Sequence, residues 1–258
     1  MVALAVRRAS QSWMTAVVLA GTILLWQIGV ASLHIPEVVL PTPAQVVKAL
    51  AGAPSYYLLE TWSTLVTTLA GFAAAAVIGT LLAILIVEVK AVEKTAYTLI
   101  VALNSVPKVA VAPLFVIWLG TGPQPKIAIA FLIALFAVVI DTVLGMKSVP
   151  ADMLDLAKTL HGRRWDVLWR VRLPCALPNM FAGLKVAVSL ALVGAIVGEF
   201  VASSRGLGYV IMTAEGTFDT SQIFAAITML GIVGVILFQI VEIAERKLIP
   251  WHSSQRRR

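Results

Sequence analysis

Polar and ionisable side chains that interrupt long apolar stretches are the residues of this sequence best placed to do chemistry. Asp141 and Glu199 are the carboxylates suited to acid–base work, while Lys108 follows Pro107 and lies close to Asn104. A charge costs free energy in hydrocarbon, so each charged residue is by default a candidate for a functional role. Asp141 and Glu199 lie towards opposite faces of the membrane that their stretches would cross, which argues against a catalytic carboxylate pair.

Each of these side chains also has a structural interpretation. Lys108 could draw anions towards a passage, or it could reach an interface or pair with an acid. Asp141 could line the same passage, or it could pair with a basic residue such as Lys185 or Lys108. Glu199 could contact the passage or its gate, although a carboxylate at the end of a span costs little. The sequence thus predicts a translocation pathway formed by Asn104, Lys108, Asp141 and Glu199.

No other catalytic or cofactor chemistry is indicated. The three histidines are far apart and show no metal-ligand spacing, and a single cysteine cannot form an internal disulfide. No Gly-Lys pair is followed by Ser or Thr, so the chain lacks a P-loop and should not hydrolyse ATP itself. The net charge of +7 reports membrane orientation rather than nucleic-acid binding. We expect a non-catalytic protein without metal or cofactor.

Composition and run length predict an all-α, polytopic membrane protein. The 258 residues are 60% hydrophobic and 13% charged, about half the charge of a typical soluble domain. A run of about 20 apolar residues spans the hydrocarbon core as a helix, and the runs here are continuous rather than alternating. Residues 1–258 are expected to form a single domain with about six spans, at Trp13–Leu33, Ser63–Val87, Thr95–Leu119, Lys126–Met146, Met180–Val201 and Ile223–Ile243.

The positions of lysine and arginine predict the orientation. With the N-terminus inside, most basic residues fall in cytoplasmic segments, above all in residues 147–179 and after the last span. This bias favours both termini in the cytoplasm. Arg7 and Arg8 precede the first span, but its apolar core is too long for a typical signal peptide.

Two local motifs predict how helices begin and pack. Thr42 and Pro43 can serve as N-cap and first residue of a short external helix that continues through Ala44–Leu50. Gly194 and Gly198 form a Gly-x-x-x-Gly pair that permits close helix approach. The sequence leaves open whether the second helix belongs to the same chain or to another copy.

The basic, polar segment 147–179 lies between two apolar spans and is the most informative part of the chain. Pro150 suits a helix start and Gly162 a helix end, which predicts two helices joined by a turn. The second helix fits Arg164–Val171, and prolines should close it and turn the chain back into the membrane. An ordinary solvated loop would explain the charge but not its large apolar residues. A surface of that kind is typical of an interaction site.

The same segment resembles the EAA loop of ABC-transporter permeases. Asp155–Ala157 stands at the Glu-Ala-Ala position, and Val171–Pro174 stands at the Ile/Val-x-Leu-Pro ending. Two departures from the pattern are an Asp with Leu156 behind it, and His161 at the glycine position with Gly162 one place later. The resemblance implies coupling to an ATPase through Asp155, Ala157, His161, Gly162, Trp165, Leu173 and Pro174.

Further segments resemble the group of such permeases that imports nitrate, sulfonates, taurine, bicarbonate and thiamine or riboflavin precursors. They are Leu40–Leu50, Pro107–Gly120, Gly198–Val201 and Gly206–Val210. The resemblance implies the type I ABC importer fold in the bacterial cytoplasmic membrane. It also implies a homodimer in lipid, two copies of a cytoplasmic ATPase and an external solute-binding protein. Alternatives of other classes are an ATPase-independent secondary transporter or channel, and an intramembrane enzyme.

Overall fold

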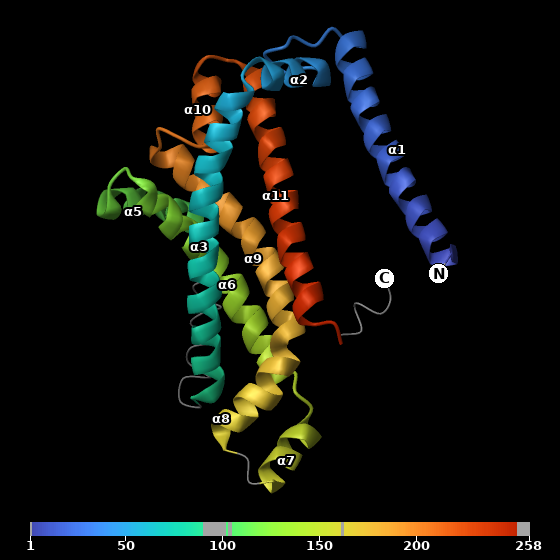
Figure 1. Ribbon diagram of the computed structural model, residues 1–258. Coiled ribbons are helices and arrows are strands. Elements are labelled where there is room, and N and C mark those ends of the chain that lie inside the picture. Colours follow the sequence, from blue (N-terminus) through green and yellow to red (C-terminus); the bar gives the residue numbers. More distant parts are fainter. Residues whose placement is uncertain (1, 90–101, 103–104, 161–162, 252–258) are drawn as a thin grey trace.

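The computed structural model describes residues 2–89, 102, 105–160 and 163–251, and every regular element among them is helical. Within these described residues, four helices are long and apolar enough to cross a membrane (Figure 1). They are α3 (Pro54–Glu88), α6 (Pro123–Lys147), α9 (Leu173–Ala202) and α11 (Thr220–Leu248). Each extends beyond the span predicted from hydropathy alone, because polar residues at the ends continue the helical hydrogen bonding. The predicted all-α, polytopic fold is confirmed.

Antiparallel α6 and α9 form the centre of the molecule and make its most extensive helix–helix contact. Small residues allow the two backbones to approach closely. An added Cβ at Gly198 would stand 2.8 Å from the Cα of Lys126, and one at Gly194 would stand 2.6 Å from the Cα of Ala130. The Gly-x-x-x-Gly pair therefore packs against α6 of the same chain, which answers the question that the sequence left open.

The third predicted span differs from expectation within its described part. A continuous helix from Thr95 to Leu119 was expected, but the chain leaves helical geometry at 105–107. The 3₁₀ turn η1 (Lys108–Val111) and the short helix α5 (Ala112–Leu119) follow. Pro107 has no N–H to donate, so it interrupts the helical ladder at this point. Residues 90–101 and 103–104, including Asn104, lie outside the described residues.

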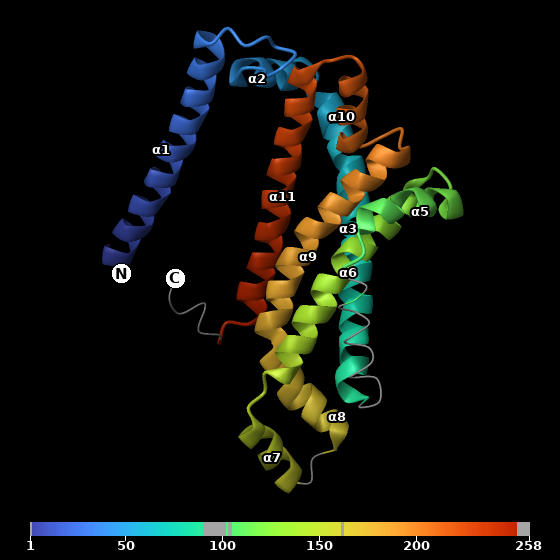
Figure 2. The same cartoon turned by 180° about the vertical axis from the view of Figure 1, so that it is seen from behind.

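Short helices lie at both ends of the bundle (Figures 1 and 2). α2 (Pro43–Gly52) and α10 (Leu207–Gly216) lie at one end, and α7 (Ala151–Thr159) and α8 (Arg164–Val167) lie at the other. The predicted cap of α2 is confirmed by a capping box between Thr42 and Gln45. α1 begins and α11 ends on the side of the bundle towards α7 and α8.

α1 (Val2–Ser32) stands apart from the bundle, and its strongest packing within this chain is against α2. Its contacts gather near its C-terminal end. There Trp26 packs against Phe224 of α11 with ring centroids 5.6 Å apart, and Gln27 accepts a hydrogen bond of 3.3 Å from the N–H of Ala44. Most described apolar side chains of α1 are exposed, as expected for a helix that faces lipid or another chain.

Candidate functional site

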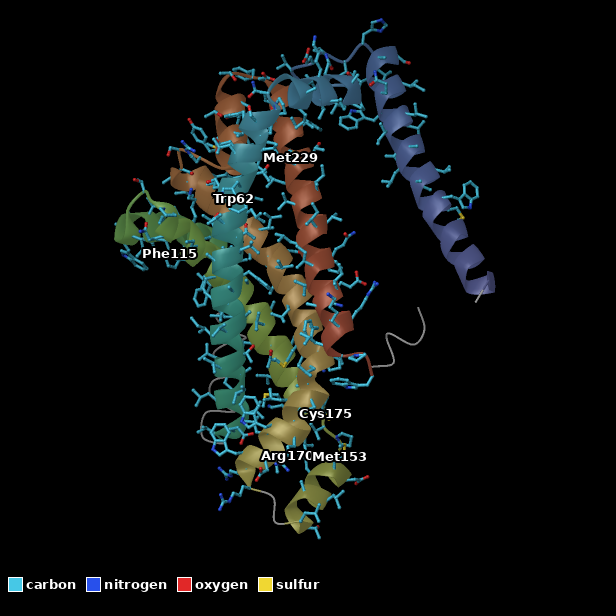
Figure 3. All side chains as sticks on the ribbon, viewed as in Figure 1. Trp62, Phe115, Met153, Arg170, Cys175 and Met229 are labelled. Atoms are coloured by element: carbon cyan, nitrogen blue, oxygen red, sulfur yellow. The ribbon has the colours of Figure 1, made fainter. Side chains whose placement is uncertain are left out.

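The polar segment between α6 and α9 forms a helical elbow at one end of the molecule. α7 leads to α8, and a single wide helical turn, η2 (Leu168–Arg172), then joins α8 directly to α9. At this turn the N–H of Leu173 donates to the carbonyl of Leu168, five residues back. Figure 3 shows Met153 and Arg170 at this end of the molecule. The predicted pair of helices is present.

The prediction that prolines end the second helix is wrong. Pro174 lies in the first turn of α9 and Pro178 lies inside it, so one helical run extends from Arg164 to Ala202. The wide turn at Leu168–Arg172 changes the hydrogen-bond register just before Pro174, which lowers the cost of its missing N–H. The elbow is therefore continuous with a membrane span rather than hinged from it.

Buried contacts anchor the elbow to the membrane helices. Leu168 is 2% exposed and packs with Met146 and Ala176 of α6 and α9. The guanidinium of Arg172 forms an ion pair of 3.1 Å with Glu88 at the end of α3. Both side chains are partly buried, so this pair is less screened than a surface pair. η2 is thus held by three membrane helices at once.

Several large apolar side chains of the elbow are exposed in this chain. Trp165 is 68% exposed and Trp169 is 61% exposed; Met153 and Leu156 on α7, and Leu160 just after it, are exposed as well. Trp165 also borders a groove of about 390 Å³ beside the end of α3. Exposed tryptophans on a rigid support are typical anchors of a protein interface. This surface, defined by these five residues, is called the elbow face below.

The structure places most of the predicted coupling residues on this elbow. Asp155 is exposed on α7, and Ala157 is half-buried. Leu173 and Pro174 are half-buried where η2 meets α9, so they support the elbow rather than extend its outer face. His161 and Gly162 lie outside the described residues.

Of the predicted pathway residues that the structure describes, Glu199 lies several turns of α9 away from Gly183, the residue that Asp141 faces. Lys108 lies half-buried on η1, with its ammonium 4.6 Å from the centroid of the Phe136 ring. Asp141 lies half-buried on α6, facing Gly183 of α9 so closely that an added Cβ would stand 2.6 Å from the Asp141 Cβ. Lys185, a possible partner of Asp141, instead pairs with Glu245 of α11 at 2.8 Å.

Glu199 lies near the opposite end of α9 from the elbow, in a buried cluster with Glu60 and Thr64 of α3. Both carboxylates and the hydroxyl accept backbone hydrogen bonds from the start of α10. Gly206 N–H donates to Glu60, Leu207 N–H to the Thr64 Oγ1 at 2.8 Å, and Gly208 N–H to Glu199 Oε2 at 2.8 Å. Thr64 in turn donates to Glu199 at 2.9 Å. Glu60, Thr64 and Glu199 are called the α10 carboxylate cluster below.

The α10 carboxylate cluster fixes α10 to α3 and α9. The first N–H groups of a helix lack internal partners and carry partial positive charge, so they stabilise buried carboxylates. Glu199 is 1% exposed, and its predicted contact with a passage would require α10 to move. Next to it, Lys126 donates to Ser203 Oγ at 2.9 Å, so this ammonium is also satisfied inside the fold.

With this geometry in place, comparison with known proteins assigns the family. Residues 75–250 match the family described as "Binding-protein-dependent transport system inner membrane component". The chain belongs to this family of ABC permeases. Residues 75–250 run from the middle of α3 to the end of α11, so the match includes the elbow and Glu199, while Glu60 and Thr64 lie before it.

Relatives of this permease carry transport names. It is 36% identical over 234 residues to the riboflavin transport system permease protein RibX of Chloroflexus aurantiacus, covering 90% of this chain and 87% of that protein. It is 32% identical over 232 residues to the formylaminopyrimidine transport permease protein ThiX of Halalkalibacterium halodurans, covering 90% and 92%. A chain of the MetNI methionine ABC transporter, solved in inward-facing conformations, matches with a TM-score of 0.64 at 17% identity. That match covers 76% of this chain and 97% of the other and shows a shared fold.

Two features of the permease were missed by reasoning from sequence. Glu88 was not recognised as the partner of Arg172, although an acid at the end of a span is a signal for such a pair. Glu60 falls before the predicted span Ser63–Val87 and Thr64 falls at its start, and neither was singled out as a site residue. Their spacing of four residues puts them on one face of α3 and could have indicated a buried polar site.

Proposed function

We propose that this permease is the membrane-spanning subunit of an ATP-driven ABC importer, and that segment 147–179 couples it to a cytoplasmic ATPase. The observation that carries the proposal is the elbow face. It presents two exposed tryptophans on a helical run that is continuous with a membrane span. A permease without a P-loop needs an ATPase on another subunit as its energy source. The exposed tryptophans of the elbow face provide a surface to which such a subunit could bind.

The continuous run from Arg164 to Ala202 supplies a physical route for coupling. Its 39 residues would extend about 58 Å at 1.5 Å per residue. Movement of the elbow therefore has to shift α9, and through the Arg172–Glu88 pair it also has to shift α3. ATP shifts the transporter between inward- and outward-facing states only if the ATPase contacts the elbow differently in the two states. The proposed coupling residues are Asp155, Ala157, His161, Gly162, Trp165, Leu173 and Pro174.

The proposed cargo is a small anionic or heterocyclic solute, such as a sulfonate, nitrate, taurine or a vitamin precursor. The riboflavin and formylaminopyrimidine names of the two relatives support the heterocyclic end of this range. We further propose a homodimer with two ATPase copies, an external solute-binding protein, and both termini in the cytoplasm. Asn104, Lys108, Asp141 and Glu199 stay the proposed pathway residues.

Replacing both elbow tryptophans tests the coupling role. Trp165→Ala together with Trp169→Ala should weaken ATPase binding about 1,000-fold or more, because buried tryptophan anchors contribute about 2–4 kcal/mol each to an interface. ATP-driven uptake into proteoliposomes should be lost, while the amount of inserted permease stays unchanged. Co-purification with the ATPase measures the first effect directly.

Trp251→Ala provides the matched control. Trp251 is 58% exposed just beyond the end of α11, outside the elbow face, so this variant should bind the ATPase and transport normally. Full uptake by the double tryptophan variant would refute the coupling role. Uptake by the permease alone, driven by an ion gradient without ATPase, would instead favour a secondary transporter or channel.

A further inference from the structure

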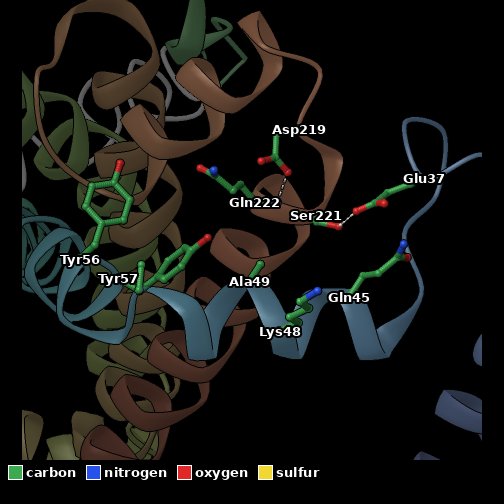
Figure 4. Close-up of a pocket in the computed structure, with 10 residues that line it drawn as sticks. Glu37, Gln45, Lys48, Ala49, Tyr56, Tyr57, Asp219, Ser221 and Gln222 are labelled. Atoms are coloured by element: carbon green, nitrogen blue, oxygen red, sulfur yellow. Dashed lines mark hydrogen bonds between the residues drawn. The ribbon is translucent and has the colours of Figure 1, made fainter.

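A cavity of about 650 Å³ opens at the end of the molecule that carries α2 and α10. Three parts of the chain that are distant in sequence form it. They are α2 with the segment before it, the start of α3, and the start of α11 (Figure 4). Its lining includes neither the elbow nor Lys108, Asp141 or Glu199, and it is called the α2–α11 cavity below.

The walls of the α2–α11 cavity are fixed by hydrogen bonds. Ser221 Oγ donates to Glu37 Oε1 at 2.8 Å, and Thr220 Oγ1 donates to the carbonyl of Val38 at 2.6 Å. Asp219 caps α11 by accepting from the N–H of Gln222 at 3.0 Å. These bonds join the 33–42 segment to α11, so the cavity is formed before any partner arrives. A preformed site avoids the ordering cost of binding.

One polar group of the cavity lining belongs to a residue that is otherwise buried. Tyr57 is 3% exposed as a whole and lines the cavity. Figure 4 shows its hydroxyl directed into the cavity on the side of Asp219. A phenol hydroxyl can both donate and accept a hydrogen bond, so from this position it can bind a polar group that enters the cavity.

The charges of the cavity select a cation. Glu37 and Asp219 each use one carboxylate oxygen in the wall, which leaves the other oxygen available, and Lys48 is the basic residue of the lining. Two carboxylates against one ammonium favour a positive ligand. The rings of Tyr56 and Tyr57 pack edge to face, with centroids 5.6 Å apart, and tyrosine faces also attract a guanidinium or an ammonium.

We propose that the α2–α11 cavity receives an arginine or lysine side chain of the external solute-binding protein. This inference rests on the proposed importer function, which makes the α2 end the external face. A guanidinium can reach a carboxylate and a phenol at once and lie on an aromatic ring, so the lining matches arginine especially well. The cavity thereby serves as a docking point that helps to choose and orient the partner, apart from the passage of solute.

Titration of the assembled transporter tests the proposal. The permease and its ATPase are placed in lipid nanodiscs and titrated with the cognate solute-binding protein. Asp219→Asn keeps the helix cap, since Asn also caps well, but removes the charge. It should raise Kd for the binding protein about tenfold, and Tyr57→Phe should raise it about fivefold. ATPase stimulation at saturating binding protein should be unchanged.

Two further variants separate charge recognition from damage to the fold. Lys48→Gln should lower Kd, because it removes the competing positive charge, and a mere loss of structure would not tighten binding. Glu215→Gln changes an exposed carboxylate of α10 outside the cavity and should leave Kd within about twofold of wild type.

Different results would refute the docking proposal and the importer function on which it rests. If Asp219→Asn binds like Glu215→Gln while the wild type is still stimulated, the docking role is refuted and the importer function stands. The docking role is also refuted if free arginine stabilises the wild type but not Asp219→Asn, while both proteins bind the solute-binding protein with the same Kd. The occupant of the cavity is then a small cation. If the binding protein never stimulates the wild type, the importer function itself fails.

Discussion

Gly206 sits at the most crowded point of the α10 carboxylate cluster. Its φ of +111° is a region that favours glycine, and an added Cβ would overlap the carboxylate of Glu199. Its N–H also donates to Glu60. A side chain at this position would strain the backbone and separate two buried carboxylates from their donors, and unsatisfied buried carboxylates are costly. The absence of a side chain at Gly206 thus allows α10 to pack against α3 and α9.

Gly206→Ala should therefore destabilise the permease strongly. We expect a loss of about 2–4 kcal/mol, from backbone strain and from displacement of Glu199. Thermal unfolding of the purified protein in detergent measures the loss as a lower Tm. Gly216→Ala is the control, since Gly216 has open space around its Cα and should change stability by less than about 1 kcal/mol. Equal Tm values for the two variants would contradict the crowding seen at Gly206.

At the scale of elements, η2 decides how the elbow relates to the membrane. A regular α-helix would place Pro174 against the carbonyl four residues back, whereas the wide turn makes room before it. Arg172, the last residue of this turn, forms an ion pair with Glu88 at the end of α3, so α3 is connected to the start of α9 at the position of the wide turn. The wide turn η2 and the Arg172–Glu88 ion pair together attach the elbow to α9 and α3.

A double-mutant cycle on Arg172 and Glu88 measures that connection. Arg172→Ala, Glu88→Ala and the double variant should give a coupling energy of about 1 kcal/mol, because both side chains are only 25% exposed. The pair Arg246–Glu242 on α11 is the control, with exposures of 52% and 21%. We expect its coupling to be about 0.3–0.5 kcal/mol. Coupling energies that are equal, or reversed in order, would show that the Arg172 pair does not anchor the elbow.

At the scale of the whole molecule, the helix directions define two ends with different chemistry. The end with α7 and α8 is basic and carries the elbow face, and the end with α2 and α10 carries the cavity (Figure 1). Membrane proteins hold their basic loops in the cytoplasm, which predicts the elbow end inside and the cavity end outside.

Cysteine labelling in intact cells tests this orientation. Cys175 is the single cysteine, so Cys175→Ala gives a background without thiols. Leu160→Cys at the elbow end and Phe218→Cys at the cavity end introduce thiols at positions that are 73% and 74% exposed. In cells that express the permease without its ATPase, a membrane-impermeant maleimide should label Phe218→Cys while the cells are intact, and Leu160→Cys only after permeabilisation. The reverse pattern would invert the topology and remove the basis for both proposals.

The sequence by itself determined the class and the order of the parts. Long apolar runs have to become helices in lipid because their backbone groups find no water, so α3, α6, α9 and α11 were predictable. Local chemistry likewise predicted the Thr42 cap and the two-helix elbow with Trp165 on it. These features depend on residues a few positions apart, and such interactions are readable from sequence.

The tertiary structure alone decided which distant residues meet. Glu60 lies 146 positions from Gly206, and Arg172 lies 84 positions from Glu88. No local pattern encodes those pairings, because they arise when helices pack side by side. The same holds for the α2–α11 cavity, whose walls come from both halves of the chain. Tertiary packing also decided that the helix continues through Pro174, because the contacts of Leu168 and Arg172 stabilise the wide turn before it.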